Sequence, residues 1–492
     1  MVHMSLMITD ILIIGAGAVG CAVARELSRY KLKVVVVDKE YDVAAGTSGR
    51  NSAVVHAGFN NKPGSLMARL CVEGNAGFET LCKELDVPYK KTGKFVVAFD
   101  EEDQKTLQII YKQGLNNGCK GLRILDGEEL KRRLPDVGGI SAMESIDTAI
   151  FDPFLYTVAL AENASCNGVL FRFGEEVKNI EKIEGKERER YSVTTDKRTY
   201  KTRYVVNCAG VGSVRVAQML GFNQYKLYPC RGEYLILDKI AEKFLQVPVY
   251  PAPKKGIGGL GVHLTPTIHG NIIIGPSAEY IEDGEDYSST KLIIDKLFDE
   301  AKKLVPTLER KHIIGAYSGI RSKQAPPSEG GFHDFLIQEE PECKGFINLI
   351  GIESPGMTAS MPIARMVCNI IGHSIDLNPN LSFNPIRKGI LKFSDQNDEE
   401  KDRLIKINPE YGEVVCRCQN VTKAEICQAI ENPLGVKSIA SIKYRVWATT
   451  GRCNGGYCFA RIAEILEKDY GINPEDITLR GKGSEYFIGR VK

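Results

Sequence analysis

The sequence lacks the features that mark several special classes of protein. It has no uninterrupted apolar run approaching the length of about 18 residues that a membrane-spanning helix needs. Its 64 basic and 62 acidic residues leave a net charge of +2, so no nucleic-acid partner is expected. It has no internal repeat and no low-complexity segment, and 43% of its residues are hydrophobic. These absences exclude disorder and a membrane span, and 492 residues suffice for two or three ordinary globular domains.

The first ten residues are too short, and too quickly followed by a strand pattern, to form a signal peptide. We therefore expect a cytoplasmic location, with association to a membrane only through a partner. The 14 cysteines of a chain in that compartment are expected to be mostly reduced and buried rather than joined in disulfides.

A strand, a glycine-rich turn, a helix and a second strand are predicted in succession near the N-terminus. The apolar run 11–14 leads into the G-x-G-x-x-G pattern of residues 15–20, and residues 21–30 have a helical pattern. A second apolar run, 34–37, ends at Asp38. This order is that of a βαβ unit that binds a dinucleotide.

Each part of this unit has a physical reason to contact the cofactor. Gly15 permits the tight turn, Gly17 lets the backbone approach a pyrophosphate, and Gly20 lets helix and strand pack closely. The helix N-terminus offers free N–H groups to the phosphates. Asp38 is placed to accept hydrogen bonds from ribose hydroxyls. The predicted contacts here are Gly15, Gly17, Ala18, Val19, Gly20, Asp38 and Lys39.

Residues 44–52 are rich in small residues and hydroxyls and directly follow the dinucleotide unit. Small residues allow close approach to a flat ring, and polar side chains can donate to phosphates. By itself the segment could equally be a surface loop with a helix N-cap at Thr47 or Ser48. Its position favours cofactor binding, through Thr47, Ser48, Arg50, Asn51 and Ser52.

Two later segments repeat the pattern of a strand followed by small residues and a helix. Residues 204–210 form an apolar run ending in Ala209 and Gly210, before a helix over 213–220. Residues 346–351 form another strand, and the turn 353–358 opens a helix, so that its N-terminus can hold an anionic or electron-rich group.

Four segments, 13–20, 47–52, 206–210 and 351–358, resemble the FAD-dependent oxidoreductases of the D-amino-acid oxidase and glycerol-3-phosphate dehydrogenase superfamily. Asp38 departs from that family, which more often has Glu there, although both acids can bind ribose. The resemblance implies an α/β and α+β fold: a Rossmann-type FAD-binding domain with an interleaved antiparallel-sheet substrate domain. It also implies FAD contacts from Val177, Ala209, Gly210, Gly351, Pro355, Gly356, Met357 and Thr358.

The expected domain boundaries follow from these segments. The FAD-dependent oxidoreductase spans 1–375, with FAD-binding parts at about 8–90, 145–230 and 331–375 and substrate-domain parts at about 91–144 and 231–330. The remainder divides into a linker over 376–410, a small helical [2Fe–2S] domain over 411–470 and a tail over 471–492.

The C-terminal part contains two close pairs of cysteines. Cys416 and Cys418 form C-x-C, and Cys453 and Cys458 form C-x4-C. Four thiolates can hold a [2Fe–2S] cluster or a structural zinc, but common zinc modules have different pair spacings. The pattern resembles the bacterioferritin-associated-ferredoxin-like [2Fe–2S] domain, which favours the cluster.

Finer resemblances point to two groups within the superfamily. Residues 56–58, 62–66, 70–71 and 261–266 resemble L-2-hydroxyglutarate dehydrogenase. The cysteine module resembles that of the anaerobic glycerol-3-phosphate dehydrogenase large subunit. A flavin beside a one-electron cluster suggests a dehydrogenase whose substrate is a small anionic secondary alcohol.

Such a reaction needs a base for the hydroxyl proton and a cation for the anionic group. His56 is the leading base because it follows the ring-side segment 47–52, although a structural histidine is the alternative. His263 is the rival base. Arg321 is the leading anion anchor, since a guanidinium matches carboxylate or phosphate bidentately. Arg231 is second, with a structural ion pair to Glu233 as an equal alternative.

The predicted function is oxidation of sn-glycerol-3-phosphate to dihydroxyacetone phosphate, by hydride transfer to FAD and electron exit through the cluster. L-2-hydroxyglutarate or an amine or amino acid are alternative substrates, and a flavin electron-transfer module without its own substrate is the non-enzyme alternative. The expected partner is an electron-acceptor protein, such as a second flavoprotein or a quinone-linked membrane subunit, in a hetero-oligomer.

Overall fold

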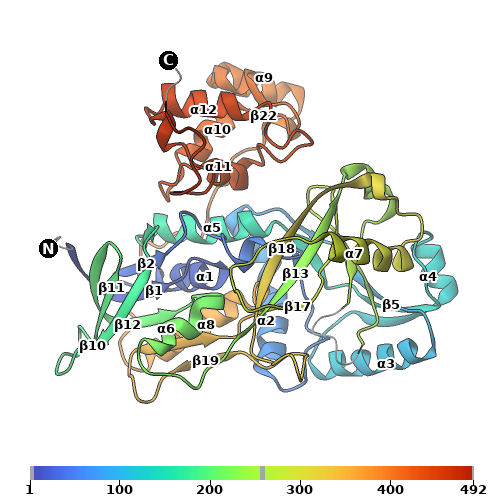
Figure 1. Ribbon diagram of the computed structural model, residues 1–492, viewed down its shortest axis with the longest axis horizontal. Helices are drawn as coiled ribbons and strands as arrows, with labels where there is room; N and C mark the ends of the chain where they lie inside the picture. Colours follow the sequence, from blue (N-terminus) through green and yellow to red (C-terminus); the bar gives the residue numbers. More distant parts are fainter. Residues whose placement is uncertain (1–4, 255–260, 490–492) are drawn as a thin grey trace.

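The computed structural model describes residues 5–254 and 261–489. Figure 1 shows two adjoining regions built on β-sheets, with a smaller helical module stacked against the first of them. The first four residues, residues 255–260 of the expected substrate domain and the last three residues of the expected tail lie outside the described part. No helix within the described part is long and apolar enough to cross a membrane.

The first sheet contains five parallel strands, in the order β20, β12, β1, β2 and β9, and an antiparallel extension beside β12. Its strands are β1 (Ser5–Ile14), β2 (Val34–Asp38), β9 (Leu170–Phe173), β10 (Val177–Lys182), β11 (Tyr191–Thr195), β12 (Arg198–Asn207), β19 (Leu336–Glu339) and β20 (Phe346–Ile350).

Both faces of this sheet are covered, which explains the continuous apolar runs of β1 and β2. Ile11 and Ile13 of β1 enter the core beneath the helices, whereas Leu12 and Ile14 enter a separate core on the other face. This alternation is the period of two of a β-strand. The covering helices are α1 (Ala18–Leu27), α2 (Leu66–Leu85), α5 (Pro153–Cys166) and α8 (Ser360–Gly372) on one face and α6 (Ser213–Gln218) on the other.

The second sheet is mainly antiparallel and is built from two stretches of chain that flank part of the first region. Its strands are β5 (Lys94–Ala98), β6 (Leu122–Asp126), β7 (Ser141–Ser145), β13 (Tyr228–Leu237), β14 (Val249–Pro251), β15 (His263–Pro266), β16 (Ile272–Gly275), β17 (Glu279–Tyr280) and β18 (Ile313–Lys323). Helices α3 (Glu101–Asn116), α4 (Gly127–Arg133) and α7 (Lys291–Leu304) pack on it. A small sheet of β3 (Val54–Val55), β4 (Tyr89–Lys91) and β8 (Ala149–Phe151) completes this part.

The C-terminal module has its own apolar core and lies beside α5 (Figure 1). It contains α9 (Asp398–Ile407), β21 (Val414–Cys416), β22 (Val421–Thr422), α10 (Lys423–Ile430), α11 (Ile439–Val446) and α12 (Phe459–Lys468). The predicted fold class, a Rossmann-type domain with an interleaved antiparallel sheet and a small helical module, is confirmed.

Two segments have more structure than the sequence indicated. The range 376–410 was expected as a linker, but it contains α9, whose Leu404 packs with Tyr411 and Ala424. The charged run there forms a helix because the side chain of its N-cap residue, Asn397, accepts a hydrogen bond from the backbone N–H of Glu400. The acidic residues of the first turn also interact favourably with the helix dipole. In the expected tail, the backbone of Thr478 and Leu479 accepts hydrogen bonds from the start of α11.

The contact between β1 and α1 generates a prediction. A Cβ added to Gly20 would lie 2.0 Å from the carbonyl oxygen of Gly15, so Gly20→Ala forces the helix away from the turn. Overpacking of this kind should lower the free energy of unfolding by about 1–3 kcal/mol. Chemical denaturation of the variant measures this loss.

Gly77→Ala is the matched control. A Cβ at Gly77 in α2 meets nothing within 4 Å. The higher helix propensity of alanine should therefore raise the free energy of unfolding by about 0.5–1 kcal/mol. Equal effects of the two substitutions would contradict the steric account.

Candidate functional site

A cavity of about 930 Å³ lies at the carboxyl ends of β1 and β2, between the two large sheets and the C-terminal module. This is the edge at which doubly wound folds bind nucleotides. Gly20 and Gly351 are not in its lining. The predicted cofactor residues that line it are Gly15, Gly17, Ala18, Val19, Asp38, Lys39, Thr47, Ser48, Arg50, Asn51, Ser52, Val177, Ala209, Gly210, Pro355, Gly356, Met357 and Thr358.

The glycine turn brings backbone, not side chains, to the cavity wall. Gly15 has φ +108°, and a Cβ there would lie 2.4 Å from the carbonyl oxygen of Cys208. A Cβ at Gly17 would lie 3.1 Å from Oγ of Ser48. The turn therefore brings the N-terminus of α1 to the cavity, where the N–H of Ala18 donates to Oγ of Ser48 (2.9 Å) and the helix dipole favours an anion such as the FAD pyrophosphate.

Asp38 is fixed at the end of β2. Its Oδ2 accepts a hydrogen bond from the backbone N–H of Ala16 (2.6 Å) and its Oδ1 from that of Glu40 (2.8 Å). Burial raises the pKa of the Asp38 carboxyl to about 6, although these two N–H groups oppose the shift. The ionised group at this position can still accept from ribose hydroxyls, so the acid expected at this place fits the nucleotide.

Segment 47–52 is held by contacts to distant parts of the chain. Thr47 donates its hydroxyl to the carbonyl of Ile320 (2.6 Å), and Nδ2 of Asn51 lies 3.1 Å from the sulfur of Met357. These bonds connect the segment to β18 and to the turn before α8. Segment 47–52, β18 and the turn before α8 therefore meet at the cavity, in an arrangement that fits a flavin ring.

The structure brings three of the four predicted catalytic residues to this cavity: His56, His263 and Arg321. Nε2 of His56 lies 3.4 Å from Oγ of Ser354. The His263 ring stacks on Tyr250 with centroids 3.7 Å apart. A second cavity of about 630 Å³ adjoins the first at His56.

The surroundings keep both imidazoles neutral. Burial, followed by the charges of Lys94 and His263, lowers the pKa of His56 well below its usual value. Burial also lowers the pKa of His263 to about 3. Its Nε2 is buried without a hydrogen-bond partner in the described part of the chain. A neutral imidazole can accept a proton, which an imidazolium cannot.

Lys94 is a site residue that the sequence did not reveal. It is 2% exposed, and its Nζ lies 4.5 and 4.3 Å from the ring centroids of Phe59 and Tyr250. Among the described residues it has no carboxylate partner, and it lines the second cavity. Burial lowers its pKa to about 7. Its strand pattern, Lys followed by four apolar residues, gave no signal for such a role.

Arg231 is not part of the site. It is 5% exposed, forms ion pairs with Glu279 (2.6 Å) and Asp286, and lies 3.8 Å from Glu233. These carboxylates already satisfy its charge, and it does not line the cavity. The prediction of an anion-binding role is therefore replaced by its structural alternative, with two further carboxylates that the sequence did not indicate.

The four predicted cluster cysteines form two pairs. Sγ of Cys418 lies 3.7 Å from Sγ of Cys453, close to the separation of about 3.8 Å expected for two thiolates on one tetrahedral metal. The thiol of Cys458 lowers the pKa of Cys416 to about 6. Gly451 gives room to Cys418, whose Cβ would be 2.2 Å from an added Cβ.

This paired arrangement fits a binuclear cluster. Among the described residues, no group of three or more His, Cys, Asp or Glu side chains converges as a site for one metal ion. In a [2Fe–2S] cluster the four thiolates are shared by two irons, so two pairs suffice. Cys416 and Cys458 are buried, whereas Cys418 and Cys453 are exposed.

The C-terminal module also contributes to the cavity wall, which the sequence did not predict. Ser438, Ala440 and Tyr444, at or in α11, line the cavity, as does Arg480. Phe154 of α5 stacks on Tyr444 with ring centroids 4.2 Å apart.

Comparisons with known proteins agree with this geometry. Residues 10–370 match the family model of FAD dependent oxidoreductases, and residues 414–468 match that of the BFD-like [2Fe-2S] binding domain. These matches confirm the predicted cofactors, FAD and a [2Fe–2S] cluster.

Individual relatives were found in sequence and in structure. The chain is 38% identical to a glycerol 3-phosphate dehydrogenase of Caloramator mitchellensis, over 98% of this chain and 99% of the relative. It is 34% identical to a mitochondrial L-2-hydroxyglutarate dehydrogenase of Arabidopsis thaliana, over 73% of this chain and 83% of the relative. The structure of L-alpha-glycerophosphate oxidase from Mycoplasma pneumoniae has a TM-score of 0.71 at 28% identity, covering 77% of this chain and 98% of that one.

The cavity at the strand ends, the paired cysteines and these matches lead to one conclusion. The chain belongs to the FAD-dependent oxidoreductases, as an enzyme of that family with a BFD-like [2Fe–2S] domain following its FAD-binding fold.

Proposed function

We propose that this enzyme is a dehydrogenase that oxidises sn-glycerol-3-phosphate to dihydroxyacetone phosphate. The observation that carries the proposal is a neutral imidazole, His56, in a cavity system that also contains Arg321 and Lys94, two cations that form no ion pair with a carboxylate among the described residues. This combination suits an anionic alcohol. Similarity to the Caloramator enzyme extends over nearly the whole chain, including the cysteine module, and supports the same substrate.

His56 is the proposed base. Its imidazole is neutral at pH 7, so a ring nitrogen can accept the proton of the substrate hydroxyl. Its backbone is fixed by a hydrogen bond from its N–H to Oγ1 of Thr358 (3.0 Å) and by Asn75, which donates to its carbonyl (3.2 Å). These contacts hold the imidazole beside the turn that precedes α8.

Arg321 and Lys94 are the proposed anchors for the anionic group. The Arg321 guanidinium donates to the carbonyl of Ser277 and has no ion pair among the described residues. Arg321 lines the first cavity and Lys94 the second, and the two cavities adjoin at His56. Buried cations of this kind attract a phosphate strongly because little water screens them.

Bound FAD supplies a two-electron acceptor and the [2Fe–2S] cluster a one-electron carrier. Within the chain, the exposed thiols of Cys418 and Cys453 place one edge of the cluster site at the surface. This exposure supports an external electron-acceptor protein as the partner. The buried pair, Cys416 and Cys458, anchors the site to the core of the module.

L-2-hydroxyglutarate is the second candidate substrate. It has two carboxylates, and Arg321 and Lys94 are two separate cations near His263. Several L-2-hydroxyglutarate dehydrogenases are 30–35% identical over about three quarters of this chain. An amine or amino acid substrate has no comparable support from the cavity.

The decisive measurement is an anaerobic absorbance spectrum of the purified enzyme during addition of each substrate. We expect sn-glycerol-3-phosphate to bleach the flavin bands, and L-2-hydroxyglutarate to leave them unchanged. Bleaching by L-2-hydroxyglutarate and not by sn-glycerol-3-phosphate would overturn the proposal and identify L-2-hydroxyglutarate as the substrate. Flavin that neither alcohol bleaches, but an amino acid does, would overturn both.

His56→Gln tests the base. Loss of a general base should lower kcat by about 10²–10⁴-fold with little change in FAD content. The control is His373→Gln, at the exposed C-cap of α8, which should retain full activity. If His56→Gln stays active and His263→Gln does not, the base is His263.

Lys94 generates a pH prediction. Because its pKa is about 7, it is charged below pH 7 and loses its charge as the pH rises, so kcat/KM should fall above about pH 7. Lys94→Met should lower kcat/KM at pH 6 by about ten- to a hundredfold and remove this alkaline decline. Lys90→Met, an exposed neighbour on β4, is the control and should leave the profile unchanged. A Lys94→Met enzyme with the same profile would refute the role.

A further inference from the structure

The C-terminal module encloses the FAD cavity rather than standing apart from it. Helix α11 and the following tail lie over the cavity, and Tyr444 and Arg480 line it together with the glycine turn 15–20 and the segment 47–52. The tail is tied to α11, because the backbone N–H groups of Ile439 and Ala440 donate to the carbonyls of Thr478 and Leu479 (3.0 and 2.9 Å). Helix and tail therefore form one continuous wall.

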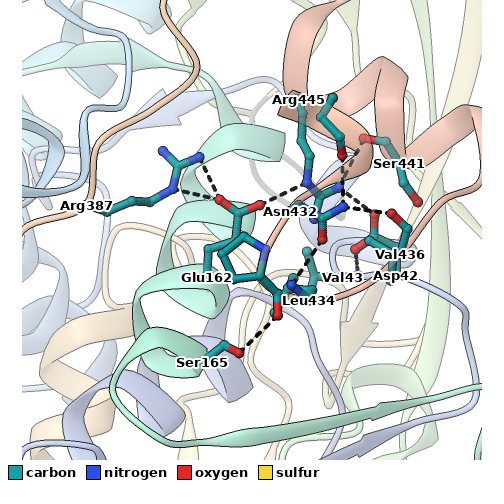
Figure 2. A network of polar contacts seen from close by, with 12 residues as sticks. Asp42, Val43, Glu162, Ser165, Arg387, Asn432, Leu434, Val436, Ser441 and Arg445 are labelled. Atoms are coloured by element: carbon teal, nitrogen blue, oxygen red, sulfur yellow. Dashed lines mark hydrogen bonds and ion pairs between the residues drawn. The ribbon is translucent and has the colours of Figure 1, made fainter. Parts of the chain in front are cut away.

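A buried ionic network fixes this wall to the FAD-binding fold. Figure 2 shows Arg445 of α11 reaching Asp42 and Glu162, each at 2.9 Å, while Arg387 binds the other oxygen of Glu162 at 2.7 Å. Arg445 is 4% exposed, so removal of one partner would leave a buried charge uncompensated. Asp42 itself lines the cavity, four residues after Asp38. Asp42 therefore belongs both to the contact that docks the module and to the lining of the cofactor site.

Aromatic contacts continue this connection to the ring-side segment. Tyr444 stacks on Phe154 with an interplanar angle of 9°. Phe154 in turn lies against Gly49, where an added Cβ would be 2.6 Å from the phenyl ring. Trp447 donates its Nε1–H to Asp152, the residue that caps α5 (2.8 Å). The module therefore contacts α5 directly, and Phe154 of α5 connects it to the segment 47–52.

The cavity lining near this wall carries both signs of charge, with Arg50 and Arg480 beside the carboxylates of Glu40 and Asp42. Burial and then the positive charge of Arg480 lower the pKa of both Arg50 and Lys443. None of these three cations has an ion pair with a carboxylate among the described residues. An anion bound between Arg50 and Arg480 would reduce the repulsion between these two cations. Arg50 and Arg480 line the cavity together with Ala18 and Val19 at the N-terminus of α1, which favours an anion.

We propose that the [2Fe–2S] module completes the FAD site, with Arg480 from the tail and Arg50 from the FAD-binding fold supplying positive charge for the cofactor diphosphate. FAD binding and module docking then stabilise each other, since a coupling between two binding events is reciprocal. The tail beyond α12 is accordingly part of the cofactor site.

Arg480→Gln tests the charge directly. Arg480 is exposed, so the substitution should not affect folding, and FAD titration of the apoprotein by fluorescence should show about fivefold weaker binding. Arg461→Gln is the matched control: Arg461 belongs to the same module, pairs with Glu464 at 2.7 Å and lies outside the cavity lining. Its FAD affinity should equal that of the unaltered protein. Equal affinity of the Arg480→Gln protein would overturn the role of Arg480.

Arg445→Gln tests the coupling. Loss of the buried network should weaken FAD binding by about tenfold or more, although Arg445 does not line the cavity. Conversely, adding FAD to the unaltered apoprotein should slow amide hydrogen exchange in α11 and not in α3, which is remote from the module. Unchanged exchange in α11 together with unchanged affinity of both variants would overturn the proposal. The exchange measurement needs no variant and remains decisive if Arg445→Gln does not fold.

Discussion

The close approach of two backbone segments at the glycine turn is the constraint on which the remaining structure depends. Gly20 lies so near the carbonyl of Gly15 that an added Cβ would be 2.0 Å from it, and a Cβ at Gly15 would be 2.4 Å from the carbonyl oxygen of Cys208, just after β12. A side chain at either Gly15 or Gly20 would therefore push the neighbouring backbone away. This packing directs the N-terminus of α1 into the cavity and places Asp38 beside it. The nucleotide site is thus a consequence of backbone proximity rather than of particular side chains.

Burial determines the chemistry at the other end of the cavity. His56 and His263 are neutral there, and Lys94 is a weakened cation, because desolvation disfavours the charged form of each group. The same low polarity that keeps the imidazoles uncharged strengthens the attraction of the cations for an anionic substrate. One physical condition therefore serves both the base and the anion anchors. Arg231 cannot serve as an anion anchor in this way, because Glu279 and Asp286 already pair with its guanidinium.

The two cofactor regions are joined by contacts that would be costly to break. The pair of Arg445 with Asp42 and Glu162 is buried, so the FAD-binding fold and the cysteine module do not separate without exposing or isolating charges. The thiols of Cys418 and Cys453 are exposed, while Cys416 and Cys458 belong to the module core. A rigid junction on one side and an exposed edge on the other suit the passage of electrons from an enclosed substrate site to an external acceptor.

The sequence by itself determined the β1–turn–α1 unit and the cysteine pairs, because each depends on residues close together in the chain and on fixed spacing. It also indicated the ordered FAD segments and three of the residues that meet in the cavity. Only the tertiary structure placed Lys94 beside His56, removed Arg231 from the site and revealed α9 in the expected linker. Only the tertiary structure brought Tyr444 and Arg480 into the cavity wall, more than 390 residues from the segment they face. Such contacts are decided by how separate elements pack, and residue spacing along one chain carries no signal for them.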